Sequence, residues 1–427
     1  IYQSDVVPEK NERIERQHNQ ELDGEMRKLG GAVQGAVVED AASSTTIDTA
    51  PAYPKRAVAM NPPQPEGSVR TSEGYVDGVR LDGFVPASGP ERYWNGTVKA
   101  FDTRMLALRP QYNRIEGAQY RFENGLVVKR YANGESRIVR GRVVSGTDIE
   151  ITTLSGDISR GGDSTTVTFR PVSTSTDHLS VTGDGTNPTV RLPTRLPAAT
   201  ADDYWQRRAA ASDSIVDATA GSDHVTLKLD GAKEYDLRVT RLTVDTAAER
   251  DTATPAAYVT AARDSMTTAV GSSVSVTLQA RDRFGNPVGG AEIELDPDGD
   301  DLGSLLPDTV TTGADGRRTV SFTPQSRMET SFDASVGDGT GVKSMTFDVE
   351  VDAADAKLPK SIYTSGQMVD GFDELDSLTL KKGRMVRASS ESCLLIGDLG
   401  GGLLGGLLGG LNCEDTEYNT ISGKIRF

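Results

Sequence analysis

The chain has 427 residues, which is enough for two to four domains. Hydrophobic residues make up only 36% of it, and 45 glycines together with many serine- and threonine-rich turns favour a mainly β protein with short strands. The formal net charge of −16 makes nucleic acid an unfavourable partner, because the phosphates would be repelled. No run of 18 apolar residues occurs, so no membrane-spanning helix is expected in this sequence.

Residues 1–40 are predicted to form a helical stalk. Pro8 lies near its start, and apolar residues from Ile14 to Val37 recur mostly three and four residues apart, which is the period of a helix. Residues 9–25 are mostly charged or amide side chains, so we expect the first half of this helix to be solvated and the second half to pack on a sheet. The glycine pair at 30–31 is a point at which the helix is open to interruption.

Residues 41–250 are predicted to form an antiparallel, β-rich domain. Asn-Gly pairs at 124–125 and 133–134 separate three apolar–polar runs, at 120–123, 126–131 and 136–139, which is typical of a meander with tight turns. Further strands are expected at 149–154, 165–172, 178–182, 189–192, 224–229 and 234–244. A helix is expected at 204–211, with Thr200 to Asp203 as its N-cap and acidic first turn. Asn95 belongs to the one Asn-x-Thr sequon without a central proline, so it is a candidate glycosylation site.

Residues 251–352 are predicted to form a separate unit, in which 251–257 is a linker. Strands are expected at 273–280, 291–295 and 318–322, with turns at 282–290 and 311–317. The sequences RDRFGNPVGGAEIEL and TTGADGRRTVSFTP, in residues 281–295 and 311–324, resemble the bacterial Ig-like domains of invasin and intimin. That resemblance covers residues 258–352. It implies a β-sandwich that serves as a spacer or an adhesive module on surface proteins.

An acidic stretch within this unit is a candidate metal site. Hard cations such as calcium take several carboxylate ligands, but the EF-hand pattern is broken, because its twelfth position would be Pro307 where a glutamate is needed. The alternatives are therefore a calcium site or an acidic turn in an acid-rich protein, and no other cofactor is expected. The candidate ligands are Asp296, Asp298, Asp300 and Asp301.

Residues 353–427 are predicted to form a C-terminal β segment with a loop closed by a disulfide. Cys393 and Cys413 are the only cysteines and bracket one glycine- and leucine-rich stretch, so we expect them to be bonded in an oxidising, extracytoplasmic setting. The stretch is too glycine-rich to order itself, so it either packs as a lid over its own domain or contacts a membrane or a neighbouring subunit. The residues predicted to make this contact are Leu394, Leu395, Ile396, Leu399, Leu403, Leu404, Leu407, Leu408 and Leu411.

The remaining sequence has a second resemblance. Aspartate exceeds glutamate, 39 to 23, and arginine exceeds lysine, 33 to 13, as in haloarchaeal proteins. Residues 7–12, 17–21, 53–57, 60–63, 112–113 and 120–124 resemble exported haloarchaeal proteins of unknown function, over roughly 1–250. Members of that family carry a hydrophobic, pilin-like N-terminal helix, which is absent here. The resemblance implies cell-surface display, with anchoring through a segment upstream of Ile1.

The sequence offers little that indicates catalysis. His18, His178 and His224 are far apart, and no Walker loop, Cys-x-x-Cys pair or Gly-x-Ser-x-Gly elbow occurs. We therefore expect a non-enzymatic, extracellular surface protein of a halophilic archaeon that acts in display, adhesion or assembly. Its expected partners are other copies or neighbouring surface proteins. The alternatives are a subunit of an extracellular filament, or a membrane-inserting or fusion protein that uses the 394–411 loop.

Overall fold

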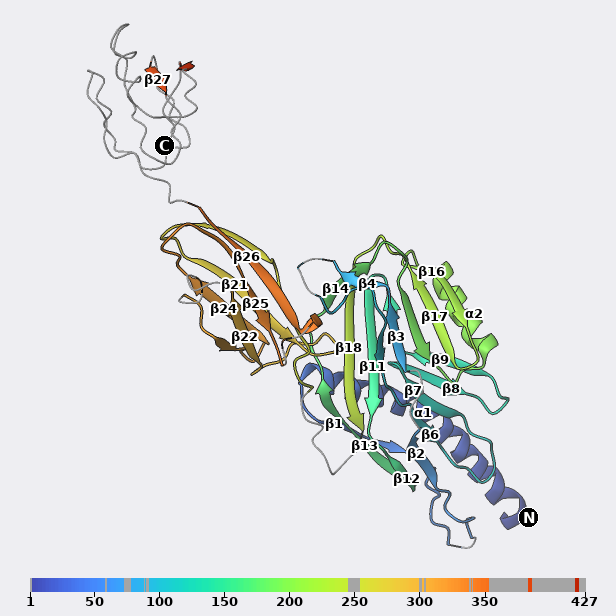
Figure 1. The fold of residues 1–427 in the computed structure, drawn as a ribbon. Coiled ribbons are helices and arrows are strands. Elements are labelled where there is room, and N and C mark those ends of the chain that lie inside the picture. The colour runs from blue at the N-terminus through green and yellow to red at the C-terminus, as the bar shows by residue number, and fades with distance from the viewer. Residues whose placement is uncertain are drawn as a thin grey trace, which may run out of the picture.

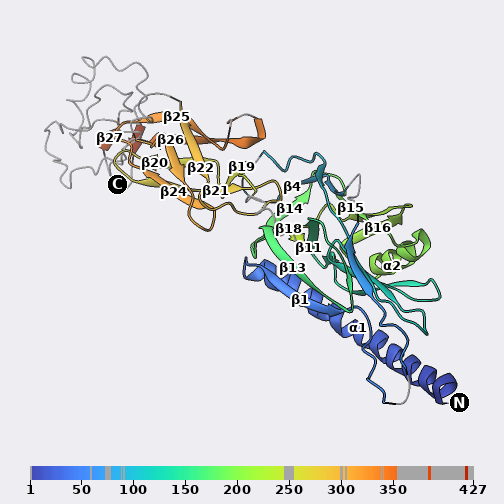
Figure 2. The ribbon, with the colours of Figure 1, turned by 90° about the horizontal axis from the view of Figure 1, so that it is seen from below.

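The computed structural model describes residues 2–57, 60–72, 78–87, 89, 92–244, 254–298, 302, 305–337, 339, 341–352, 383–385 and 419–421. These residues form a mainly β body with two parts, here called the first domain (up to residue 244) and the second unit (254–352) (Figure 1). The two parts lie end to end. The second unit lies at one end of this body and the N-terminal end of the long helix at the other (Figures 1 and 2).

The long helix α1 (Val7–Val38) follows a π-helical turn, η1 (Tyr2–Val6), and continues through Gly30 and Gly31. Its second half buries an apolar face against the sheets of the first domain, as its three- and four-residue spacing predicts. The first half is not a solvated stalk as predicted, because Asn11 and Glu15 are only 1% and 0% exposed. These two polar side chains are accommodated by hydrogen bonds from the first domain, which the sequence pattern of the helix alone does not reveal.

Three sheets make up the β structure described in the first domain. The first sheet contains β1 (Ser43–Asp48), β13 (Ser164–Ser173), β18 (Tyr235–Val244), β11 (Asp148–Ser155) and β10 (Val144–Ser145), with β14 (Leu179–Gly183) and β4 (Phe84–Pro86) continuing beside β18. The second contains β12 (Ser159–Gly162), β2 (Gly67–Thr71), β6 (Leu106–Arg109), β7 (Gln119–Glu123), β8 (Leu126–Arg130) and β9 (Ser136–Arg140). The third contains β16 (Ile215–Ala220), β17 (His224–Leu229), β15 (Thr189–Pro193), β3 (Val79–Asp82) and β5 (Lys99–Phe101).

The predicted meander is present in the second sheet. Asn124 and Gly125 have φ values of +55° and +93° and form the two-residue turn between β7 and β8, while Gly134 at +89° closes the turn between β8 and β9. The antiparallel prediction is wrong for one central pair, because β11 and β18 run parallel from the pair Asp148–Asp236 onward. A long connection that includes the intervening strands and a helix makes this parallel pairing geometrically accessible.

The second helix, α2 (Ala198–Ala210), begins earlier than predicted. Its N-cap is Pro197, so Asp202 and Asp203 lie inside the helix and not at its cap. Trp205 is 2% exposed and anchors the helix to the hydrophobic core of the first domain. The helix packs mainly against β16, its neighbour in sequence.

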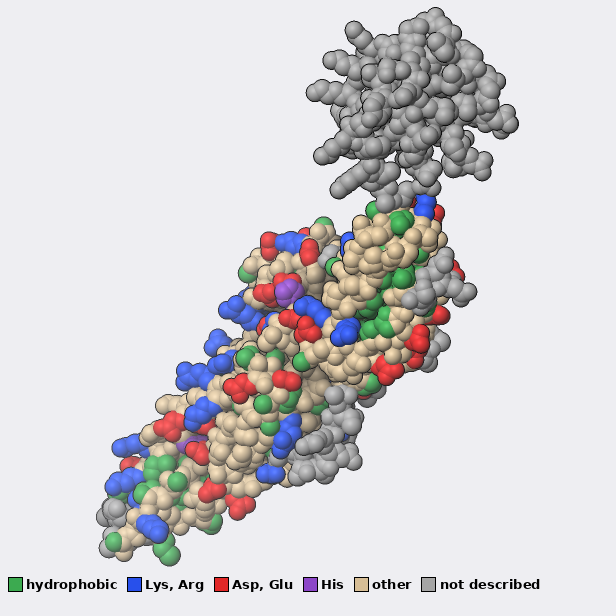
Figure 3. All heavy atoms as spheres, turned by 90° about the vertical axis from the view of Figure 1, so that its left-hand side faces the viewer, with side chains coloured by type: hydrophobic (Ala, Val, Ile, Leu, Met, Phe, Trp, Pro, Cys, Tyr) green, Lys and Arg blue, Asp and Glu red, His purple; other side chains and the backbone are tan. Residues whose placement is uncertain are grey.

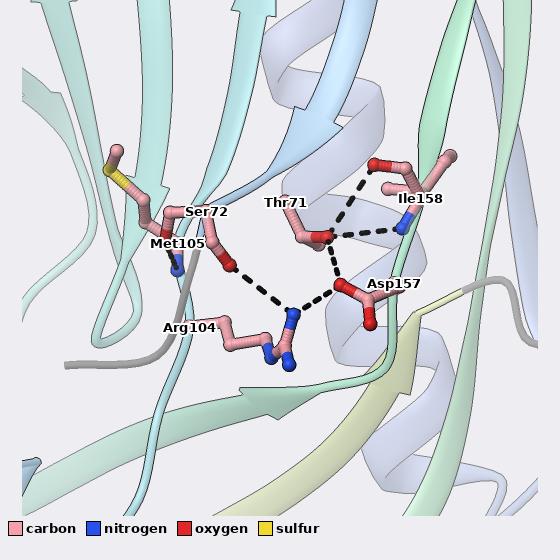
Figure 4. A network of polar contacts seen from close by, with 6 residues as sticks. All are labelled: Thr71, Ser72, Arg104, Met105, Asp157 and Ile158. Carbon is pink, nitrogen blue, oxygen red and sulfur yellow. Dashed lines mark hydrogen bonds and ion pairs between the residues drawn. The ribbon is translucent and has the colours of Figure 1, made fainter. Parts of the chain in front are cut away.

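A polar network fixes the C-terminal end of strand β2 to the turn between β11 and β12 (Figure 4). The Thr71 hydroxyl donates to a carboxylate oxygen of Asp157 at 3.3 Å and accepts from the Ile158 N–H at 3.0 Å. The guanidinium of Arg104 also pairs with Asp157 and donates to the Ser72 carbonyl at 3.4 Å. The network joins segments that are far apart in sequence. Its main effect is therefore to stabilise the packing of these segments against one another, and not the conformation of any one strand.

The second unit consists of two sheets that enclose one hydrophobic core, to which Leu278 and Phe322 contribute from one sheet and Phe332 and Phe347 from the other. A short 3-10 turn, η2 (Gly341–Lys343), precedes the last strand of this unit, β26 (Ser344–Asp352), which pairs in parallel with β20 (Ser265–Ala269). One sheet contains β19 (Tyr258–Ala261), β21 (Val274–Arg281) and β24 (Arg317–Phe322). The other contains β20 (Ser265–Ala269), β26 (Ser344–Asp352), β25 (Met328–Ser335), β22 (Glu292–Pro297) and β23 (Thr309–Thr311).

Two short strands, β27 (Gly383–Met385) and β28 (Asn419–Ile421), pair antiparallel near the end of the chain. Cys393, Cys413 and the apolar stretch 394–411 lie between them in sequence and outside the described residues. The predicted disulfide and the predicted contacts of this stretch therefore remain predictions. Among the helices of the described part, none is both long and apolar enough to cross a membrane.

Candidate functional site at the junction of two β units

The turn at 282–286 of the second unit inserts into the first domain. Phe284, at its tip, is only 3% exposed and belongs to the hydrophobic core formed by the first domain. Its ring stacks on that of Phe101 with 5.2 Å between the ring centroids. Gly285 follows with a φ of +88°, a conformation that glycine adopts without strain and that reverses the chain after the inserted ring. The predicted turn is therefore present, and its Phe284 side chain fills a place in the core of the first domain; this inserted side chain is called the plug below.

A buried polar network surrounds the base of this turn. The Asp282 carboxylate accepts hydrogen bonds from the Ser173 hydroxyl at 2.5 Å and from the N–H groups of Phe284 and Asn286 at 2.9 and 3.0 Å. The Asn286 amide donates to the Ser173 hydroxyl oxygen at 2.6 Å and to the Val239 carbonyl at 2.9 Å. Ser173 and Val239 belong to the first domain, so the network joins the two parts through directional bonds.

Aromatic side chains form the other side of the junction. The indole N–H of Trp94 donates to the Tyr258 hydroxyl at 3.1 Å, with Trp94 1% and Tyr258 0% exposed. The ring of Tyr93 stacks on that of Tyr258, with 4.6 Å between centroids and 4° between planes. The Tyr93 hydroxyl donates to the Arg283 carbonyl at 3.3 Å. Stacking and hydrogen bonds together constrain both the distance and the angle between the two parts.

The electrostatics of the junction favour a structural role for its carboxylate. Burial raises the pKa of Asp282, while the hydrogen bonds from Ser173 and from two backbone N–H groups act in the opposite direction. The donors satisfy the carboxylate, and Asp282 is only 3% exposed. A cleft of about 610 Å³ lies next to this junction and includes Tyr93, Phe284, Arg241 and Arg283 in its walls.

A second hydrogen-bonded cluster, centred on Glu15, lies along α1. The Glu15 carboxylate accepts from the N–H groups of Asn113, Arg114 and Ile115 at 3.1, 2.8 and 3.1 Å, and from the Tyr53 hydroxyl. Burial is the main reason that the pKa of Tyr53 is raised. This group fixes the helix to the 113–115 loop.

The same helix face continues toward its C-terminal half with two further contacts. The Nδ1 atom of His18 lies 2.8 Å from the Tyr112 hydroxyl, and burial lowers the pKa of this histidine. The Asp23 carboxylate accepts from the Tyr120 hydroxyl at 2.7 Å and pairs with Lys129 at 2.9 Å. All of these contacts join α1 to the second sheet or its loops, so they anchor the helix.

The structure places the predicted site residues in separate regions. Asn95 is exposed on a loop of the first domain, where its side-chain oxygen accepts from the Thr97 hydroxyl at 2.5 Å. Asp296 and Asp298 are exposed in the second unit, whereas Asp300 and Asp301 lie outside the described residues. Within the described part of the chain, no group of three histidine, cysteine, aspartate or glutamate side chains is arranged to hold a metal ion.

The three histidines occupy different places and have different neighbours. His178 pairs with Asp236 at 3.0 Å, His224 lies 2.8 Å from an Asp223 carboxylate oxygen, and His18 lies on α1 as described above. The fold therefore leaves them in three local environments and does not combine them into one site.

Sequence reasoning identified the 282–290 turn but missed its insertion into the first domain. The available signal was Phe284, a large aromatic residue in a turn where exposure would be unfavourable. The residues that meet the turn, Phe101 and Ser173, lie more than a hundred residues earlier in the sequence, and no local pattern connects them with it.

Comparisons with known proteins do not assign a family. No family model matches the sequence, and no curated protein matches it. Among solved structures, domains 4 and 5 of the S-layer protein SbsC match with 13% identity over 30% of this chain and 63% of that chain, at a TM-score of 0.19. The D00-D0 domain of intimin matches with 13% identity over 41% of this chain and 65% of that chain, also at 0.19. Invasin, a bacterial integrin-binding protein, matches with 14% identity over 73% and 60%, at 0.17.

The matched region thus spans less than two thirds of each of the SbsC and intimin chains. TM-scores this low do not establish a shared fold, so these likenesses support no function by themselves.

Proposed function

We propose that this protein is a non-enzymatic cell-surface protein that acts in display, adhesion or assembly, with the second unit as an Ig-like sandwich that extends the body outward. The observation that carries the proposal is the junction. Phe284 is buried in the core of the first domain, and Ser173, Asp282 and Asn286 form a buried bridge between the two parts. A flexible tether would not need either feature, whereas a protein that presents a distal module at a fixed distance and angle requires them.

The shape and surface of the body support the same role. Its two parts lie end to end, and the face seen from the second unit carries interspersed acidic and basic side chains (Figures 1 and 3). A net charge of −16 keeps such a surface hydrated and soluble, and salt screens the repulsion between its carboxylates. We extend the proposal to a halophilic archaeal source, with anchoring upstream of Ile1 and glycosylation at Asn95.

Surface labelling of intact cells tests the location directly. A membrane-impermeant amine reagent, applied to cells of the native source, should label this chain and leave a cytoplasmic marker unlabelled. The same reagent applied to lysed cells is the control that both proteins are reactive. Labelling of the chain only after lysis would contradict the proposal.

The predicted Cys393–Cys413 disulfide follows from the same extracellular location. We expect that the denatured, unreduced native protein contains no reactive thiol, and that two thiols per chain appear after reduction. Thiol labelling followed by mass spectrometry distinguishes these states. Two labelled cysteines without reduction would show that the bond is absent.

A further inference from the structure

A groove of about 830 Å³ lies between the edge strand β9 and the helix α2. Three consecutive residues of β9, from Ser136 to Ile138, line one wall. Because side chains alternate between the two faces of a strand, three successive lining residues indicate that the strand presents its edge to the groove. The opposite wall is one face of α2, formed by residues spaced four apart on the helix. These are Ala199, Thr200, Asp203, Tyr204, Arg207 and Arg208.

The edge of β9 offers backbone groups that no strand in the described part of the chain pairs with, because β9 is the last strand of its sheet. The N–H of Tyr131 donates to the Glu135 carbonyl at 2.8 Å, which makes this pair the hydrogen-bonded kind. Bonded and non-bonded pairs alternate along an antiparallel ladder, so the next pair, Arg130–Ser136, is non-bonded. The N–H and C=O of Ser136 therefore point away from β8, and those of Ile138, two residues further, do the same.

The walls have the chemistry of a peptide groove. Tyr131, Ile138 and Tyr204 are half-buried and provide apolar surface, and Leu196 is buried among the lining residues. Asp203 is already paired with Arg207 at 2.6 Å. The remaining charged lining residues are Arg137, Arg208 and Glu135, so the lining has a net charge of +1 in a chain whose net charge is −16.

We propose that this groove binds an extended acidic segment from a second copy of the chain, which adds to the edge of β9 as an extra strand. The inference rests on the proposed role in assembly and names the surface through which copies meet. The segment at residues 369–380 has the matching composition, with four acids, no basic residue and no proline. Its large apolar residues are Val369, Phe372, Leu375, Leu378 and Leu380.

A second copy is the better source than the same copy because of the layout of the molecule. The last strand of the second unit, β26, leads the chain to the end of that unit that lies away from the first domain (Figures 1 and 2). Helix α2 lies on the opposite side of the first domain. Segment 369–380 follows β26 in sequence, and β26 ends on the side of the body that lies away from α2 (Figure 1), so the groove of a neighbouring copy is the proposed site.

The test uses the full chain and a fluorescent synthetic peptide of residues 369–380. We expect fluorescence polarisation to show saturable binding, and analytical ultracentrifugation to show self-association that excess unlabelled peptide suppresses. Ser136→Pro removes the outward N–H while leaving the hydrogen bonds between β8 and β9 intact, so it should weaken peptide binding and self-association by about tenfold each. Ser136→Ala keeps that N–H and should change the two affinities little. Circular dichroism checks that both variants are folded.

A peptide that is N-methylated at alternate residues tests strand addition without changing the protein. It retains the side chains but loses the backbone donors, so it should bind at least about tenfold more weakly than its parent. Equal binding of both peptides, or equal behaviour of Ser136→Pro and the unmodified chain, would overturn strand addition. Peptide binding without self-association of the chain would overturn the second copy as occupant. The surface-labelling result is independent of all these outcomes, so failure of this inference and failure of the proposed function remain distinguishable.

Discussion

The Glu15 carboxylate on α1 is completely buried and is surrounded by donors from another part of the fold. A glutamate among polar helix residues is ordinarily expected in water. Here the loop at 113–115 directs three backbone N–H groups at it, and burial without them would be highly unfavourable. The sequence cannot reveal this pairing, because the partners lie about a hundred residues apart and contribute backbone atoms rather than side chains.

Replacing Glu15 by alanine should lower the free energy of unfolding of the first domain by about 3 kcal/mol, because several buried N–H groups lose their acceptor. Glu12→Ala is the matched control on the same helix. In the described part of the chain Glu12 pairs with Arg16, and the side chains of this pair are 38% and 64% exposed, so the loss should stay below about 0.5 kcal/mol. Denaturant titrations of both variants in high salt measure the difference, and equal losses would show that the Glu15 network contributes little.

Asp282 gives the junction a specific pH dependence. Burial raises its pKa in the folded protein above the unfolded value of 3.8. The folded state therefore holds the proton more tightly, and this residue's contribution to stability decreases as the pH rises through the folded pKa. We expect Asp282→Asn to lack this part of the pH dependence.

Unfolding midpoints measured from about pH 4 to about pH 7 in the two proteins should therefore differ in slope. The unmodified protein should lose stability relative to Asp282→Asn as the pH rises. Parallel curves would indicate that Asp282 titrates as it does in the unfolded chain.

At the scale of elements, local signals predicted local structure well. The Asn-Gly pair at 124–125 specifies a tight hairpin because both residues tolerate positive φ, and the structure has that turn. The alternating run at 224–229 corresponds residue for residue to β17. Long-range features were not predictable in this way. Parallel pairing of β11 with β18 depends on tertiary packing, since a strand pattern carries no information about the direction of its neighbour.

The inserted turn should make the two parts of the body unfold together. Phe284→Ala should cost about 3–4 kcal/mol and split the calorimetric transition in two, because it removes the plug from the core of the first domain. Phe332→Ala is the control, since Phe332 is 1% exposed in the core of the second unit, where it stacks on Phe347. It should destabilise the second unit by a similar amount while leaving the junction intact. A single unsplit transition in Phe284→Ala would mean that the plug does not couple the two parts.

For the whole molecule, charge predicts a dependence on salt. The net charge of −16 places many carboxylates on one body, and their repulsion is screened as ionic strength rises. The melting temperature should therefore increase from low to multimolar KCl. Sucrose at matched water activity is a control for general solute effects. A melting temperature that does not change with KCl would argue against a halophilic source.

The parallel pairing of β20 with β26 has a mechanical consequence. These strands lie close to the entry and the exit of the second unit, and five residue pairs from Ser265–Asp348 to Ala269–Asp352 join them. When tension is applied to the two ends of the unit, the strands are pulled in opposite directions along their length, so the bonds between them are loaded in shear and share the force. Rupture then requires them to fail nearly together, which makes forced unfolding slow. Under flow or traction the body would thus remain extended at forces that would open an ordinary hairpin. In such a hairpin the hydrogen bonds are loaded one at a time and break one after another.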